Sequence, residues 1–179
     1  MTGWFVFLAY LAAVNPPRLR PGVTTGEEPG QLKQLAVGAA TVAGTGLVLV
    51  LAADGFLDAL NITDETWRLA AGVVSILVGA RVVVAPQLSE MPDPSHFGLI
   101  PIAFPLLFTP QLAALAVLFG ATESFGMAWG WLVTGVVAGA AVGHLRYRRP
   151  GLWLALARIL GALLVALGIA LVVAGIRDV

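Results

Sequence analysis

Long apolar stretches alternate with short polar connections along this chain. Four of them are about 17 to 25 residues long, and a helix needs about 20 apolar residues to cross the hydrocarbon core of a membrane. These four stretches are 35–53, 67–85, 127–143 and 152–176. Each of them predicts one membrane-spanning helix.

Two further apolar stretches are interrupted by proline. The stretch 3–14 would be only about 18 Å long as a helix, and it ends in Asn15-Pro16. The stretch 99–119 carries no charge but contains three prolines, the last of which is Pro110. Proline removes a helical hydrogen bond and frees a carbonyl group. We therefore predict that the first and fourth membrane segments are broken helices.

The two halves of the chain resemble each other. A shift of 94 residues places Asn15-Pro16 over Thr109-Pro110. Matches further along follow in the same order at shifts of 95 and 90, and the last of them pairs Arg68 with Arg158. Three weak matches at nearly one offset indicate an internal repeat of three segments.

The repeat predicts the fold class. Three crossings are an odd number, so the second unit enters the membrane from the opposite side, as in the inverted repeats of secondary transporters. We predict an all-α integral membrane protein of six transmembrane segments. Residues 1–85 and 99–179 form its two inverted three-helix repeats, and residues 86–98 form the linker loop.

Composition supports this prediction and excludes other classes of protein. Of the 179 residues 59% are hydrophobic and only 11% are charged, whereas soluble domains have about 25% charged residues. The net charge is zero and there is no cysteine. We therefore expect no nucleic-acid partner and no thiolate chemistry. No catalytic or metal-ligand pattern stands in a span, so we also expect no enzymatic activity, no cofactor and no metal site.

The distribution of charge predicts the orientation. Outside the segments, the basic residues that fall in the first, third and fifth loops are Arg18, Arg20, Lys33, Arg146, Arg148 and Arg149. In the second and fourth loops all charged residues are acidic, and the C-terminal tail contains one basic residue. The positive-inside rule then places both termini of this multi-pass protein outside the cell and the basic loops in the cytoplasm. Asp54 and Asp58 are expected in a solvated outer loop.

Several blocks resemble the MarC family of bacterial inner-membrane proteins. Pro16 and Pro21 keep the spacing of the family's first proline motif, and residues 61–72 (NITDETWRLAAG) are similar to its stretch ending in Arg-Ile-Ala-Gly-Gly. Residues 100–110 (IPIAFPLLFTP) are close to its Pro-Leu-Ala-Ile-Pro-Leu-Leu-Ala-Gly-Pro-Gly, and Arg158 fits the arginine that opens its last helix. The resemblance covers nearly the whole chain. It implies localisation in the bacterial inner membrane and export of small solutes, with neutral amino acids as the substrate class.

Candidate substrate-binding residues lie at the two breaks: Asn15, Pro16, Thr109, Pro110 and Gln111. Asn15 and Thr109 could hydrogen-bond a substrate carboxylate or ammonium group, help to coordinate an ion, or cap the broken backbone locally. Gln111 could instead form a hydrogen bond between helices. Broken helices of transporters bind substrate near the membrane midplane, so we place the expected site there.

Arg68 and Arg158 are candidates for a structural or gating role. An arginine within a span costs a few kcal/mol unless it is paired or reaches the interface. Asp64 and Glu65 lie one turn before Arg68 and are expected to pair with it. Arg158 has no such neighbour, so a carbonyl, a carboxylate of another helix or an anionic substrate group is its expected partner.

Two functions follow as hypotheses. The first is a secondary transporter that works by alternating access on a small-molecule substrate, with Na⁺ or H⁺ left open as coupling ion. The second is a non-transporting membrane subunit that stabilises a larger complex. It is favoured by bulkier residues where MarC proteins have glycine, namely Arg18, Thr109 and Gln111. The oligomeric state is not determined by the sequence.

Overall fold

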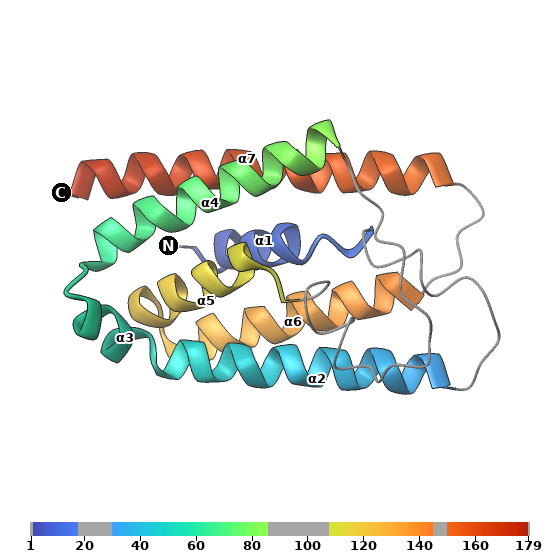
Figure 1. The fold of residues 1–179 in the computed structure, drawn as a ribbon, viewed down its shortest axis with the longest axis horizontal. Coiled ribbons are helices and arrows are strands. Elements are labelled where there is room, and N and C mark those ends of the chain that lie inside the picture. The colour runs from blue at the N-terminus through green and yellow to red at the C-terminus, as the bar shows by residue number, and fades with distance from the viewer. Residues whose placement is uncertain (1, 18–29, 86–107, 145–149, 179) are drawn as a thin grey trace.

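The computed structural model describes residues 2–17, 30–85, 108–144 and 150–178, and all regular secondary structure in these ranges is helical (Figure 1). The helices are α1 (Gly3–Val14), α2 (Gly30–Leu51), α3 (Ala53–Leu60), α4 (Asp64–Val84), α5 (Pro110–Thr122), α6 (Phe125–His144) and α7 (Pro150–Asp178). The linker predicted at 86–98 and the beginning of the segment predicted at 99–119 lie outside the described residues.

Four predicted helices are confirmed, because α1, α4, α6 and α7 agree with them to within three residues at every end. The start of α4 illustrates the local cause. Thr63 is the N-cap residue, and its hydroxyl accepts a hydrogen bond from the backbone N–H of Thr66. A threonine in this position satisfies one of the free N–H groups of the first turn.

The predicted helix 35–53 is broken near its end, and the predicted outer loop is partly helical. α2 ends at Leu51, and the chain bends by 56° into the short helix α3. Ala53 and Leu57, one turn apart on α3, are buried in a small cluster with Val117 of α5. This apolar face keeps α3 against the bundle, while Asp54 and Asp58 stay exposed.

In the described part of the chain, three helices are long and apolar enough to cross a membrane, namely α4, α6 and α7. The bent pair α2–α3 makes a fourth if it is counted as one span. α1 and α5 are apolar but shorter, with 12 and 13 residues. A helix of this length reaches about 18–20 Å, which is less than the thickness of the hydrocarbon core.

The two short helices occupy the centre of the molecule. α4 and α7 lie side by side along one edge, α2 lies along the other, and α1, α5 and α6 lie between them (Figure 1). The central position explains why nearly all of α5 from Gln111 to Phe119 is buried. Within this core the ring of Tyr10 packs edge-to-face on Phe119, with a centroid distance of 5.3 Å.

The outer helices expose large apolar side chains instead of covering them. Leu51, Leu77, Val84, Ile159 and Ile176 are among those that are exposed. A soluble monomer rarely exposes extended apolar surface, whereas lipid accommodates it. These surfaces and the spanning helices together indicate a membrane protein.

Glycine allows α4 and α7 to pack closely as an antiparallel pair. A methyl group added to Gly72 would lie 2.8 Å from the carbonyl oxygen of Gly168, and one added to Gly79 would lie 2.7 Å from that of Gly161. The third contact of the series joins Gly175 to the carbonyl of Glu65. We call these contacts, which recur every seven residues, the glycine seam. Glycine permits such contact because it has no side chain to hold the backbones apart.

Small residues are buried on two further helix faces. Gly135 and Gly139 of α6 face α1, where added methyl groups would approach Tyr10 and Val14. On α4 the small residues Ala71, Ser75 and Gly79, which follow one another at four-residue steps, are buried. The α4 glycines that contact the α7 backbone, Gly72 and Gly79, are seven residues apart, and this spacing keeps them on one face of the helix.

Acidic residues gather at one end of the bundle, where α3 lies and where α5 and α7 end (Figure 1). We call this the α3 end. All six acidic residues in the described ranges belong to it: Asp54, Asp58, Asp64, Glu65, Glu123 and Asp178. Arg81, near the end of α4, and Arg158, in the third turn of α7, lie toward the opposite end.

Candidate functional site

α1 ends at Asn15 in a left-handed backbone conformation, with a φ of 45°. Asparagine adopts this conformation more readily than most residues with a side chain. A short 3₁₀ turn at Pro16 and Pro17 follows, because proline has no N–H to continue the helix. The break predicted after residue 14 is therefore present.

The Asn15 side chain connects α1 to α7. Its Nδ2 atom donates a hydrogen bond to the carbonyl oxygen of Ala157 at 3.2 Å, and the residue is only 2% exposed. The amide N–H group of Asn15 therefore does not cap its own helix, which was one of the roles considered for this residue. It joins two helices that are 142 positions apart in sequence.

α5 begins at Pro110, as the second predicted break requires. Pro110 stands in the first turn of α5, where a missing N–H costs no hydrogen bond. Thr109 precedes it in an extended conformation and is 7% exposed. Its hydroxyl makes no capping hydrogen bond, so local capping is not its role either.

Gln111 connects α5 to α1. Its Nε2 atom donates to the carbonyl oxygen of Ala13 at 3.1 Å, and the residue is 1% exposed. The interhelical hydrogen bond considered for Gln111 is thus present. It places the start of α5 beside the end of α1, so the predicted site residues come together. We call Asn15, Pro16, Thr109, Pro110 and Gln111 the polar junction.

Several polar atoms at the centre of the bundle have no hydrogen-bond partner in the described part of the chain. At the polar junction these are Asn15 Oδ1, Thr109 Oγ1 and Gln111 Oε1. The hydroxyl of Tyr10, on α1, is a fourth. An unpaired buried polar group costs about 1–3 kcal/mol. The junction therefore has unused hydrogen-bonding capacity in an otherwise apolar core.

The polar junction lies away from the α3 end. Ala157, which Asn15 contacts, is near the start of α7, and Val14 packs against Gly139 in the last third of α6. The seam pairs Gly161 with Gly79, so this level of α7 lies near the end of α4. The junction is thus closer to the end of the bundle at which α4 ends and α7 begins than to the α3 end.

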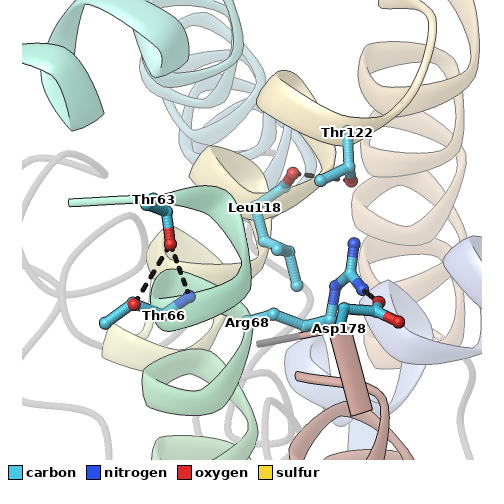
Figure 2. A network of polar contacts seen from close by, with 6 residues as sticks. All are labelled: Thr63, Thr66, Arg68, Leu118, Thr122 and Asp178. Carbon is cyan, nitrogen blue, oxygen red and sulfur yellow. Dashed lines mark hydrogen bonds and ion pairs between the residues drawn. The ribbon is translucent and has the colours of Figure 1, made fainter. Parts of the chain in front are cut away.

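Arg68 pairs with Asp178 rather than with its neighbours on α4. Its Nη1 atom contacts Oδ2 of Asp178 in the last turn of α7, as Figure 2 shows. Arg68 forms no ion pair with Asp64 or Glu65, which were its expected partners. α4 and α7 run side by side, so the end of α7 brings a carboxylate to Arg68. The ion pair joins the two helices at the α3 end.

Arg158 forms no ion pair with any acidic residue in the described ranges, so the carboxylate partner considered for it is not present there. Its side chain is exposed on α7, and those acidic residues lie at the α3 end. Ala157 beside it faces Asn15, and successive residues of a helix point about 100° apart. Arg158 therefore points away from the polar junction.

An open hollow at the α3 end is the other polar feature. It measures about 660 Å³ and is lined by Asp54, Leu57, Asp58, Asn61, Ile62, Thr63, Asp64, Glu65 and Ala121. In the described ranges no group of three or more histidine, aspartate or glutamate side chains could hold a metal ion. The four carboxylates therefore form an acidic surface at this end.

Tyr10 and the seam glycines Gly72, Gly168 and Gly175 were not selected from the sequence. A tyrosine in an apolar helix is a weak indication of a functional site, because its aromatic ring commonly packs in a hydrophobic core. The seam had a stronger signal, since Gly72 and Gly79 are seven residues apart and so are Gly161, Gly168 and Gly175. A search for seven-residue spacing of glycine would have found it.

The chain matches no protein-family model, no curated protein and no solved structure.

Proposed function

We propose that this protein is a divergent member of the MarC family and a secondary transporter of small polar solutes. The substrate class implied by the resemblance is neutral amino acids. One observation carries the proposal. The polar junction is buried where the short helix α1 ends and the short helix α5 begins, and three of its side-chain oxygens have no hydrogen-bond partner among the described residues. Transporters bind their substrates between such discontinuous helices.

The chemistry of the junction suits a small polar solute. The first N–H groups of a helix have no intrahelical partner and carry partial positive charge, so the start of α5 suits an anionic group. The end of α1 carries the opposite partial charge. Thr109 leaves the α5 N-terminus uncapped by its side chain. The junction thus has donors and acceptors available to a solute.

The helix positions support an inverted repeat of six segments. α2 begins at residue 30 and α6 at residue 125, an offset of 95. This value agrees with the offset of 94 that relates Asn15-Pro16 to Thr109-Pro110. In this proposal α1 and α5 lie within the two segments that are interrupted by proline.

The seam suggests which parts would move. α4 and α7 are joined along their length by the glycine seam and at the α3 end by Arg68 and Asp178. α1, α2, α5 and α6 pack on one another as a second group. Hydrogen bonds from Asn15 to Ala157 and from Trp67 of α4 to Ala114 of α5 bridge the groups. Rocking of one group against the other would break the hydrogen bond of Asn15 and open the junction to one side, which is alternating access.

In this proposal both termini and the α3 end face the outside of the inner membrane. The acidic side chains gathered at the α3 end fit that side, since α6 ends and α7 begins at the other end, on either side of a sequence predicted to be a basic cytoplasmic loop. The polar junction then lies toward the cytoplasmic side of the bundle, where a solute enters before export.

Uptake and counterflow in proteoliposomes test the proposal. The panel is labelled glycine, alanine, serine and lysine, with and without Na⁺ or proton gradients. We expect flux of a neutral amino acid that is reduced at least about tenfold in Asn15→Leu and Thr109→Val, because each variant removes a polar side-chain group with which the solute would form a hydrogen bond. Ser75→Ala is the matched control, since Ser75 has a buried, unpartnered hydroxyl on α4 away from the junction.

Two results would contradict parts of the proposal. Flux that survives in folded Asn15→Leu and Thr109→Val would keep transport and discard the junction as its site. Absence of flux for every solute, under every gradient, would contradict transport itself.

A non-transporting membrane subunit is the second candidate. The observation that favours it is that Asn15 and Gln111 each tie two helices together and are almost fully buried. A junction that serves only to join helices would stay closed. Pull-down of a stable partner from mild detergent, combined with no flux in liposomes, would favour this function.

A further inference from the structure

The side-chain oxygens of the polar junction have no hydrogen-bond donor among the described residues, and a ligand could supply one. Asn15 and Gln111 each use their amide N–H₂ group to bind a backbone carbonyl, of Ala157 and Ala13 respectively. Rotating either amide by 180° would place oxygen against oxygen, which is repulsive. The amide oxygens are therefore the atoms left over, and they can only accept.

Thr109 adds a third oxygen. Its hydroxyl makes no cap on α5 and has no partner within the described ranges. The hydrogen bond from Gln111 to Ala13 keeps the start of α5 beside the end of α1. The residues are less than a tenth exposed, so bulk water does not surround these oxygens. The group they lack is one that carries positive charge or donates hydrogen bonds.

The charge of the junction decides what kind of cation suits it. No carboxylate among the described residues lies near, because all of these acidic residues belong to the α3 end. Mg²⁺ and Ca²⁺ sites in proteins are built on carboxylates. Neutral oxygens alone suit a monovalent cation, whose charge they can stabilise without neutralising it.

The helix dipoles act in opposite directions here. The C-terminal end of α1 has partial negative charge and attracts a cation at Asn15, whereas the N-terminal end of α5 has partial positive charge. The net dipole contribution is small for this reason. Binding then depends on the three side-chain oxygens, and the loss of one is expected to weaken it strongly.

We propose that Asn15, Thr109 and Gln111 bind a small monovalent cationic group through their side-chain oxygens. The group is either Na⁺ or the ammonium group of the transported solute, since both are small cations that such oxygens bind. This inference deepens the proposed function, because it assigns the cationic ligand of the same site. Binding is nevertheless measurable without transport.

Thermal unfolding of the purified full chain in detergent tests the inference. A ligand that binds only the folded state raises the Tm in a saturable manner. NaCl, KCl and methylammonium chloride are compared with choline chloride at the same chloride concentration, because choline is a much larger cation without an N–H donor. We expect Na⁺ or methylammonium, or both, to raise the Tm above the choline value.

Variants assign the effect to the junction. Thr109→Val keeps side-chain size and removes the hydroxyl oxygen, and Gln111→Met removes the amide oxygen together with the Nε2 donor to Ala13. In both variants the cation concentration at half-maximal shift should rise at least about tenfold. Thr109→Ser keeps the hydroxyl and should preserve the shift. Ser75→Ala is again the control and should also preserve it.

The outcomes separate this inference from transport. A shift produced by Na⁺ alone identifies an alkali-ion site, and a shift produced by methylammonium alone identifies an ammonium site. No shift above choline, or an equal shift in Thr109→Val and Gln111→Met, overturns the inference even if amino acids are transported. A junction-dependent shift without any flux sustains the inference and contradicts the transport function.

Discussion

Asn15 is held by its backbone and by its side chain, and the two constraints can be separated. The left-handed backbone lets the chain leave α1 toward Pro16, and the amide holds α1 against Ala157 of α7. A residue with a β-carbon pays about 1–2 kcal/mol in this conformation, whereas glycine adopts it freely. The hydrogen bond of the side chain is a separate contribution of about 1 kcal/mol.

Substitution of Asn15 measures both contributions. Asn15→Gly removes the hydrogen bond but fits the backbone, so we expect a loss of about 1 kcal/mol in the free energy of unfolding. Asn15→Ala also meets the backbone strain and should lose about 1 kcal/mol more. Equilibrium unfolding in mixed micelles compares the two. Equal losses would show that the left-handed conformation places no constraint on this position.

The glycine seam is the main feature at the scale of helices. It brings the backbones of α4 and α7 together at Gly72–Gly168 and Gly79–Gly161, where added methyl groups would lie under 3.1 Å from the opposite carbonyl oxygens. We expect two long helices packed in this way to move as one body. The Arg68–Asp178 ion pair closes the same pair of helices at the α3 end.

Alanine substitution tests the seam. Gly72→Ala should destabilise the fold by about 1–3 kcal/mol, because the new methyl group overpacks against Gly168. Gly44→Ala is the matched control: Gly44 lies within α2 and has nothing within 4 Å of an added methyl group. It should be neutral or stabilise by up to about 1 kcal/mol, as alanine favours helices. Equal thermal stabilities of the two variants would be incompatible with a close seam.

The whole molecule has two chemically different ends. The acidic side chains of the described ranges gather at the α3 end, and α4 and α6 end and α7 begins at the other. If the protein lies in the inner membrane as proposed, the α3 end faces outward. The absence of cysteine makes this orientation directly measurable.

Single cysteines placed at the two ends report the orientation. Gly55→Cys on α3 and Gly151→Cys at the start of α7 both put the side chain in open space. A membrane-impermeant maleimide should label Gly55→Cys in cells with a permeabilised outer membrane and an intact inner membrane. It should label Gly151→Cys only after the inner membrane is opened. The reverse pattern would invert the proposed topology.

The sequence by itself determined four of the helices and the helix boundaries at proline, because both depend on local chemistry, whereas it did not predict the bend after α2 or the short helix α3. Apolar stretches predicted α1, α4, α6 and α7 to within three residues. The breaks at Asn15-Pro16 and at Pro110 follow from proline, which acts on its own turn of helix. Local pattern also marked Asn15, Thr109 and Gln111 as polar residues beside those breaks.

Only the tertiary structure decided which residues contact one another, since partners depend on the rotation and register of helices that are distant in sequence. It gave Arg68 a partner on α7 rather than on its own helix, and it turned Arg158 outward. It also directed the amide groups of Asn15 and Gln111 to carbonyls 142 and 98 positions away. Packing sets these relations, and no local pattern contains them.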